Sequence, residues 1–139
     1  MANMIVPQDA EINYLELLIS SILSIANMHL LSALPVGGVT PTTTLAQLLA
    51  VEATFTGYAP VQLTTWTTAV IDGSGAASST SSNGIFSNTG GAPTSVFGMF
   101  LTDSVTTHAY GAEDYGGAIS IPAGLGFQDV LTFTVLSRY

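Results

Sequence analysis

Apolar side chains recur at helical spacing over the first part of the chain, between Asp9 and Asn27. Pro7-Gln8-Asp9 opens this run, and Asp9 and Glu11 place negative charge at the end where a helix dipole favours it. We therefore predict a short extended arm, Met1–Pro7, and a helix that Asp9 caps and Asn27 ends. The apolar stripe is wide, so we expect the helix to be covered on more than one face. Its members are Ile12, Leu15, Leu18, Ile19, Ile22, Leu23 and Ile25.

The next stretch of the chain predicts one strand and a second helix. Met28–Leu34 is an apolar run that Pro35-Val36-Gly37-Gly38 interrupts. Within Thr42–Ala53, the leucines at positions 45, 48 and 49 recur at helical spacing. We expect a threonine at position 42, 43 or 44 to cap this helix.

From Phe55 onward the period becomes that of β-strands. β-branched and aromatic residues dominate, and turn residues recur roughly every 8–12 positions, which is typical of a sandwich or a barrel. The predicted strands are Val61–Trp66, Ala69–Ile71, Ala77–Thr80, Gly84–Asn88, Thr94–Thr102, Thr106–Tyr110, Gly117–Ile121 and Gln128–Leu136. The expected fold is mainly β, an antiparallel β-sandwich (jelly-roll-like) with an N-terminal arm and one or two short helices. We predict a division into an arm and helix, residues 1–27, and a β-sandwich domain, residues 28–139.

One predicted strand, Thr94–Thr102, carries apolar side chains on both faces. Val96 and Phe100 point one way, and Phe97, Met99 and Leu101 point the other. Such a strand either lies centrally between two layers or exposes one face to a partner.

The charge inventory narrows the classes of function. The 139 residues contain no lysine, a single arginine at position 138 and nine acidic residues, for a net charge of −8. Only 7% of residues are charged, against about 25% in an average domain. Direct nucleic-acid binding is excluded because phosphate neutralisation needs lysine and arginine, and anionic membrane surfaces are disfavoured too. A surface with few long charged side chains loses little entropy on burial, which suits permanent subunit contacts. The alternative is an acidic domain of an ordinary secreted protein.

The absence of cysteine and the interruption of the longest apolar segment remove further classes. Without cysteine there are no disulfides, thiolate metal sites or cysteine nucleophiles, and a small secreted domain often carries disulfides. Tyr14–Val36 is largely apolar, but Glu16, Asn27 and His29 interrupt it. A charge at the bilayer centre costs at least about 2.5 kcal/mol, so we expect no membrane span.

Few residues offer catalytic chemistry. His29 lies in an apolar run and is interpreted as structural. His108 has Asp103 and Ser104 nearby in sequence, but a catalytic triad is defined by geometry, and no Gly-x-Ser-x-Gly motif is present. The adjacent acids Glu113-Asp114 would point to opposite faces of a strand, and no calcium-loop or phosphate-loop spacing occurs. We therefore expect no enzyme activity, no metal and no cofactor.

Three aromatic residues suggest a second kind of binding site. Trp66 with Tyr58 and Tyr110 could form a platform on which a sugar stacks. Packing in a core or an interface is the favoured interpretation of these side chains.

Several sequence stretches together carry a resemblance. They are Ile5-Val6-Pro7 before the first helix, Leu45-Ala46 followed by residues 52–59 (EATFTGYA), 86–91 (FSNTGG), 96–103 (VFGMFLTD) and 119–124 (ISIPAG). Their order resembles a family of small tailed-bacteriophage virion accessory proteins of the capsid decoration, or cement, type. The resemblance implies a virion protein on the phage head, often a homo-oligomer (trimer), whose partners are the major capsid protein or other virion subunits. It implies no catalytic residues.

The expected function is thus a virion structural protein that stabilises the head by protein–protein contacts. The alternatives are a tail, neck or fibre-base subunit, or a carbohydrate-binding module. The residues predicted to contact partners come from the arm, one helix face and the two-faced strand; they are Met4, Ile5, Val6, Pro7, Ile12, Leu15, Ile19, Phe97 and Met99.

Overall fold

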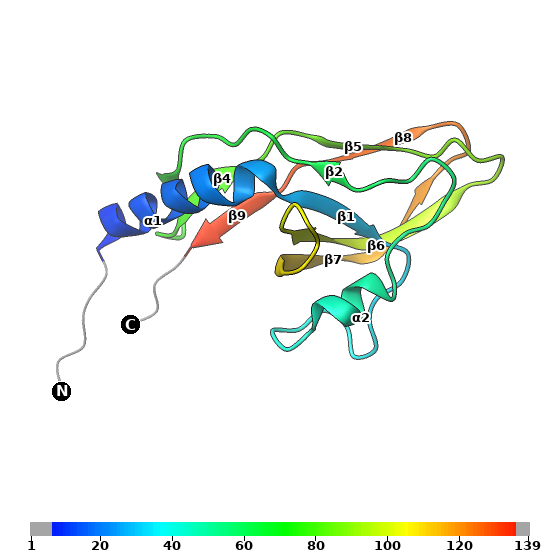
Figure 1. The fold of residues 1–139 in the computed structure, drawn as a ribbon, viewed down its shortest axis with the longest axis horizontal. Coiled ribbons are helices and arrows are strands. Elements are labelled where there is room, and N and C mark those ends of the chain that lie inside the picture. Colours follow the sequence, from blue (N-terminus) through cyan, green and yellow to red (C-terminus); the bar gives the residue numbers. More distant parts are fainter. Residues whose placement is uncertain (1–6, 136–139) are drawn as a thin grey trace. The chain divides into compact units, whose positions relative to one another are not determined.

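A computed structural model of the chain describes residues 7–135 (Figure 1). The fold is mainly β with antiparallel sheets and two short helices, as predicted. Its elements are α1 (Gln8–Ser21), a 3₁₀ turn η1 (Leu23–Ile25), β1 (Asn27–Leu31), α2 (Leu45–Leu49), β2 (Val61–Gln62), β3 (Val70–Ile71), β4 (Ala77–Thr80), β5 (Gly84–Ser87), β6 (Thr94–Thr102), β7 (Ala109–Ile121), β8 (Gly126–Asp129) and β9 (Thr132–Val135). The predicted arm lies outside the described residues except for Pro7.

The chain forms two compact units, and each is discontinuous in sequence. The helix unit comprises residues 7–25, 63–83 and 130–135 of the described chain, and the sheet unit comprises residues 26–62 and 84–129. The predicted division into residues 1–27 and 28–139 stays a prediction. Apolar periodicity does not reveal that the chain leaves a unit and later returns to it.

In the helix unit, α1 packs on the three-stranded sheet β3-β4-β9 (Figure 1). Leu15 and Leu23 bury their side chains there with three alanines of the sheet and its approaches, Ala69, Ala76 and Ala77. Small residues on the sheet let the helix approach closely, so the larger helix side chains fill the space between the layers.

The limits of α1 differ from the predicted ones. Pro7 occupies the N-cap position without a side-chain bond, and Asp9 lies in the first turn instead of capping the helix. The helix ends at Ser21, not Asn27, and the hydroxyls of Ser20 and Ser21 both donate to the carbonyl oxygen of Leu17. Such bonds from serine back to the preceding turn compete with helix continuation.

The sheet unit contains a four-stranded antiparallel sheet in the order β2-β1-β6-β7 and the separate pair β5-β8. β6 spans Thr94–Thr102 as predicted, and β1 and β7 flank it on either side. Residues 98–102 are all buried, so the central position, one of the two predicted alternatives, is the one this strand takes. Gly98 permits the close approach of β7, because a β-carbon there would collide with the carbonyl oxygen of Glu113.

α2 covers one end of this sheet and is capped as expected. Thr44 accepts a hydrogen bond from the Gln47 backbone N–H, and the Gln47 side chain accepts one from the Thr44 N–H. This capping box satisfies two donors that a helix start leaves open. Leu48 then packs with Leu31 and Phe100 in the core of the unit.

Several strand predictions were wrong in their boundaries: β1 ends at Leu31 and β2 at Gln62, earlier than predicted. Residues 109–110 of the segment predicted at 106–110 and the whole segment predicted at 117–121 belong to the single strand β7, whose pairing with β6 skips residues 115–118 around Gly116, at φ 75°. The segment predicted at 128–136 is broken in two, because β8 pairs with β5 and β9 pairs with β4. The register shift beside Gly116 keeps β7 continuous where the sequence pattern predicts two strands.

Candidate functional site

The predicted contact residues fall into three structural settings. Met4, Ile5 and Val6 lie outside the described residues, and Pro7 is exposed. Leu15 and Met99 are fully buried inside their own units, where they contribute core packing. The remaining three, Ile12, Ile19 and Phe97, are half-buried. The predicted contacts of Ile12 and Ile19 stay predictions, and the most exposed side chains of α1 form a different set.

That set forms the outer face of α1, defined by Asn13, Tyr14, Leu17, Ser20 and Ser21. These positions share one side of a helix with 3.6 residues per turn. Tyr14 is 53% exposed and Leu17 is 64% exposed. None of the five residues is charged, and the exposed Asp9 precedes Asn13 by one helical turn; Glu11 is buried, and Glu16 accepts the Ala69 backbone N–H at 2.6 Å. The sequence gives little signal for this face, because Asn13, Ser20 and Ser21 flank its two large side chains and the larger apolar stripe lies elsewhere on the helix.

A second uncharged surface is the outer half of β7, defined here as residues 116–120. All five of these residues are exposed, and Ile119 is the largest of them. Among residues 7–135, no other strand pairs with the far edge of β7. Glu113 and Asp114 precede this segment, and residues 116–120 themselves carry no charge. Its backbone edge therefore has no charged side chains that would hinder pairing with another strand.

The most connected polar group in the sheet unit is His29 on β1. Its Nδ1 lies 2.7 Å from Glu52 Oε1, and its Nε2 lies 2.9 Å from the hydroxyl oxygen of Thr102 on β6. The ring also stacks on Phe100, with ring centroids 4.5 Å apart. The structural role expected of His29 accordingly has a definite form: the ring joins three segments of the chain.

Tyr58 extends this cluster through its hydroxyl. The hydroxyl oxygen accepts the Leu30 backbone N–H at 3.1 Å and donates its proton to Glu52 Oε1 at 2.8 Å. Burial raises the pKa of Tyr58 well above its usual range, and the neighbouring Glu52 carboxylate raises it further. The Tyr58 hydroxyl therefore stays protonated and keeps both of its hydrogen bonds.

His108 belongs to a different setting, the β6–β7 loop of residues 103–108. The Asp103 carboxylate accepts the backbone N–H groups of Thr107, at 2.6 Å, and His108, at 2.9 Å. A hydrogen bond from the Thr107 hydroxyl is the main cause that lowers the pKa of Asp103 to about 2. The His108 ring is 77% exposed, and its Nδ1 lies beside that same hydroxyl. Asp103 thus organises a loop, and the geometry aligns no serine nucleophile with His108.

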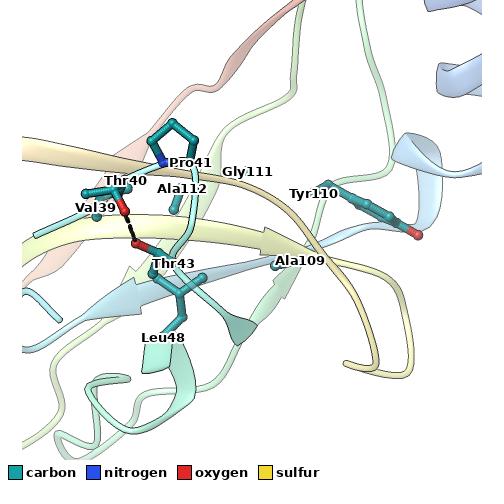
Figure 2. Close-up of a pocket in the computed structure, with 9 residues that line it drawn as sticks. All are labelled: Val39, Thr40, Pro41, Thr43, Leu48, Ala109, Tyr110, Gly111 and Ala112. Atoms are coloured by element: carbon teal, nitrogen blue, oxygen red, sulfur yellow. Dashed lines mark hydrogen bonds between the residues drawn. The ribbon is translucent and has the colours of Figure 1, made fainter. Parts of the chain in front are cut away.

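A cavity of about 470 Å³ in the sheet unit lies between the start of β7 and the segment before α2. Thr40, Thr43 and Leu48 line one side, and their hydroxyls and methyl groups carry no charge (Figure 2). Tyr110 lines the cavity as well, but Figure 2 shows its ring directed away from the two threonines. Nothing in this lining favours a charged ligand.

Tyr58 and Trp66, two of the three aromatic residues of the proposed sugar platform, have different surroundings within their own units. Tyr58 lies in the sheet unit, where Leu30 and Glu52 occupy its hydroxyl. Trp66 lies in the helix unit and lines a hollow of about 230 Å³. Its indole N–H donates to the Leu23 carbonyl oxygen at 2.9 Å. Packing, the favoured interpretation, accounts for both side chains.

Within residues 7–135, no cluster of three or more acidic, histidine or cysteine side chains is arranged to hold a metal ion. None of the helices described there has the length and apolar character needed to cross a membrane.

Comparison with protein-family models, with curated proteins and with solved structures finds no match to this chain. The resemblance to phage virion proteins therefore stays a prediction from the sequence stretches given above. Function is accordingly argued from the surfaces and side chains of the structure itself.

Proposed function

We propose that this chain is a structural subunit of a virion, and specifically a capsid decoration subunit that stabilises a phage head. The observation that carries the proposal is the outer face of α1, on which Tyr14 and Leu17 are exposed and no charge is present. An apolar face without charges is typical of the centre of a protein–protein interface. The helix presents this face although its inner side already fills the core.

The overall charge of the chain indicates what kind of partner surface would bind it. With nine acidic residues and one basic residue, the chain repels other acidic surfaces. The partner is therefore a protein surface with an apolar centre and a neutral or basic rim, such as a site between copies of the major capsid protein. The outer half of β7 gives a second contact surface, and its partner is another subunit of a trimer.

The size of these surfaces fits a repeated, moderate contact. A helix of 14 residues is about 21 Å long, and one of its faces supplies only part of the roughly 800 Å² that a stable interface needs from each partner. Several such contacts per oligomer give strong retention through avidity, even where each contact is weak alone. Stabilising a capsid shell requires several weak contacts that act together.

The test compares incorporation of two variants into phage particles. Leu17→Glu places a charge on the outer face of α1, and Thr64→Glu places the same charge on an exposed residue of the helix unit away from that face. We expect Leu17→Glu to lower the amount of this chain in purified particles at least tenfold, and Thr64→Glu to leave it unchanged. Particles that lack the wild-type chain altogether would overturn the proposal.

Copy number separates the head from the tail. Quantitative mass spectrometry of the same particles gives the ratio of this chain to the major capsid protein and to the tail proteins. A ratio fixed to the capsid protein supports decoration. A ratio fixed to tail proteins moves the subunit to the tail, neck or fibre base.

A carbohydrate-binding module is the second candidate, and one observation favours it. The hollow beside Trp66 is lined by hydroxyl-bearing residues: Thr65, Thr67, Thr80, Ser81 and Ser82. Hydroxyls beside an aromatic ring suit a sugar. Binding on a glycan array that Trp66→Ala abolishes would support this candidate, and an array without binding would remove it.

A further inference from the structure

β9 is an edge strand of the helix unit, and its outer side exposes backbone hydrogen-bonding groups. β4 lies on one side of β9, and among residues 7–135 no strand lies on the other side (Figure 1). The Ser81 N–H, just after β4, donates to the Leu131 carbonyl oxygen at 2.8 Å. Since only alternate residues of an antiparallel strand bond to a given partner, this bond places the backbone groups of Thr132 and Thr134 on the side away from β4.

β9 lacks the features by which other edges of the molecule hinder pairing. Residues 130–135 contain no charge, proline or glycine, and the β4–β9 register is unbroken. β7, in contrast, carries Glu113 and Asp114 and has two register shifts opposite β6. β2 and β3 are only two residues long. Charge, irregular register and short length are usual protections of an edge, so β9 is the least protected of these edges.

The outward groups of β9 are complementary to those of a second copy. When two copies of β9 run antiparallel about a two-fold axis at Phe133, Thr132 of each copy lies opposite Thr134 of the other. Each such pair exchanges both of its N–H···O bonds, so every outward group of the two threonines gains a partner. The two Phe133 residues then form a pair without backbone bonds, in which Cα atoms lie about 4.5 Å apart and side chains are closest. An aromatic pair at such a position stabilises the pairing of two strands.

The side chains and the charge of β9 favour a second copy as the occupant. Phe133 is only half-buried, so it keeps apolar surface for a partner, and Thr132 and Thr134 are exposed on the opposite face. At a net charge of −8, two copies of this chain repel each other over most of their surface. Residues 130–135 carry no charge, so two copies meet along this edge without placing acids opposite one another.

We propose that β9 is a self-association edge: β9 of a second copy pairs with it antiparallel across a two-fold axis and joins the two three-stranded sheets into one. A strand of four residues supplies only part of the roughly 800 Å² that a stable interface needs from each partner. The contact is therefore weak between free chains and becomes strong where copies are held side by side.

The use of this contact on a particle rests on the proposed virion role, whereas the pairing itself does not. β9 belongs to the helix unit and the outer half of β7 to the sheet unit, so the pairing uses a surface other than the one proposed for the trimer. Trimers at neighbouring three-fold positions of a closed shell are related by two-fold axes. Pairing of β9 across such an axis ties adjacent trimers together.

The first experiment measures self-association of the whole chain by sedimentation over a range of concentrations. Thr134→Pro removes one outward N–H and leaves the bonds to β4 in place, because proline is tolerated where the N–H does not join the ladder. Thr134→Val is the matched control, since it keeps that N–H. We expect Thr134→Pro to weaken association at least tenfold relative to Thr134→Val. Equal association of the two variants, or a wild-type chain that does not associate, would overturn the proposal.

Amide exchange locates the contact in the wild-type chain and does not depend on the folding of a variant. The N–H groups of Thr132 and Thr134 should gain protection severalfold between low and high chain concentration. The Phe133 N–H, which faces β4, should be protected at both. Protection of the two threonines that is independent of concentration contradicts the pairing, because a segment of the same chain then covers the edge. Absence of protection at every concentration contradicts it as well.

Cysteine cross-linking tests the register, and the chain contains no cysteine of its own. In the proposed register, position 132 of one copy and position 134 of the other have Cα atoms about 5.5 Å apart, which suits a disulfide. Identical positions of the two copies lie about 7–8 Å apart, beyond that range. Under mild oxidation, a mixture of Thr132→Cys and Thr134→Cys chains should therefore cross-link severalfold faster than either variant alone.

Equal cross-linking rates in the mixture and in the separate variants would rule out this register and with it the two-fold pairing. That result would leave the proposed virion role untouched, since the role rests on the outer face of α1 and on particle content. Conversely, particles that lack this chain would remove the virion role, and the pairing of β9 in solution would stand.

Discussion

The helix unit and the sheet unit have similar fractions of apolar residues but build their cores differently. In the helix unit a single helix lies on a small sheet and leaves Tyr14 and Leu17 outside. In the sheet unit, the large side chains Phe100, Leu31 and Met99 are fully buried, and a histidine is buried with them. Both units also leave some large apolar side chains exposed, such as Leu17 in the helix unit and Val105 in the sheet unit, so the contrast between them lies in how their cores are built.

The polar groups show the same contrast. In the helix unit, two half-buried side chains bond to backbone groups: Trp66 donates to Leu23 and Glu16 accepts from Ala69. In the sheet unit, side chains bond to one another: His29, Glu52, Tyr58 and Thr102 form one network. Such networks fix a unique arrangement when every member is satisfied. The sheet unit is therefore expected to respond more sharply to the loss of one group.

The largest expected effect is Phe100→Ala in the sheet unit. Removing a buried phenylalanine side chain costs about 3–5 kcal/mol, and here the His29 ring loses its stacking surface as well. Leu15→Ala is the counterpart in the helix unit, at about 2–5 kcal/mol. Chemical denaturation gives the free energies of unfolding. A smaller loss for Phe100→Ala than for Leu15→Ala would reverse the comparison.

Removal of one hydrogen-bonding group from each unit tests the polar contrast. Tyr58→Phe leaves the Leu30 N–H and one position of Glu52 without their partner, which should cost about 1–3 kcal/mol. Trp66→Phe removes the single bond to Leu23, and the half-exposed site lets water replace it, so about 1 kcal/mol is expected. Hydrogen exchange in each unit locates the loss. Equal effects would show that the network adds nothing beyond its separate bonds.

Local patterns predicted the elements that depend on local residues. β4 and β6 have the predicted limits, and Thr44 caps α2 as expected, because alternation and capping involve neighbours in sequence. The end of α1 was missed, since apolar spacing continues past Ser21 into the 3₁₀ turn.

The candidate sites were less predictable because they combine distant residues. Glu52 and Thr102 lie 23 and 73 positions from His29, and no spacing rule connects them. The exposed face of α1 escaped prediction for another reason. The most apolar stripe of an amphipathic helix faces the core, so Ile12, Leu15 and Ile19 point inward, and the surface for a partner consists of what remains.

Leu17 tests the contrast between the outer face and the core of the helix unit. Because it is exposed, its large side chain should contribute almost nothing to the stability of the fold. Leu17→Ala should change the free energy of unfolding by no more than about 0.5 kcal/mol, as is usual for exposed positions. Leu15→Ala, two positions earlier and buried, is the control. Thermal or chemical unfolding measures both. A large loss at Leu17 would mean that the outer face of α1 serves the fold, and the interface role would then lack its main support.

The smallest expected effect is the acid response of the β6–β7 loop. Hydrogen bonds from Thr107 and His108 lower the pKa of Asp103 to about 2, from an ordinary value near 3.8. Because the folded value is depressed, the contribution to stability is fully present above about pH 4 and is lost as the pH falls through 2. The Asp103 side chain is 15% exposed, and the hydrogen bonds that it accepts come from its own loop, so the effect should be confined to the loop. Carboxyl ¹³C shifts follow the titration, and amide exchange of Thr107 follows the loop. Asp103→Asn should give the same loosened loop at neutral pH, while the buried core around Phe100 keeps its protection. If amides of the core lose their protection from exchange in acid together with those of the loop, then the loop and the network unfold as one cooperative structure. The contrast between surface and core would then not hold at this end of the sheet unit.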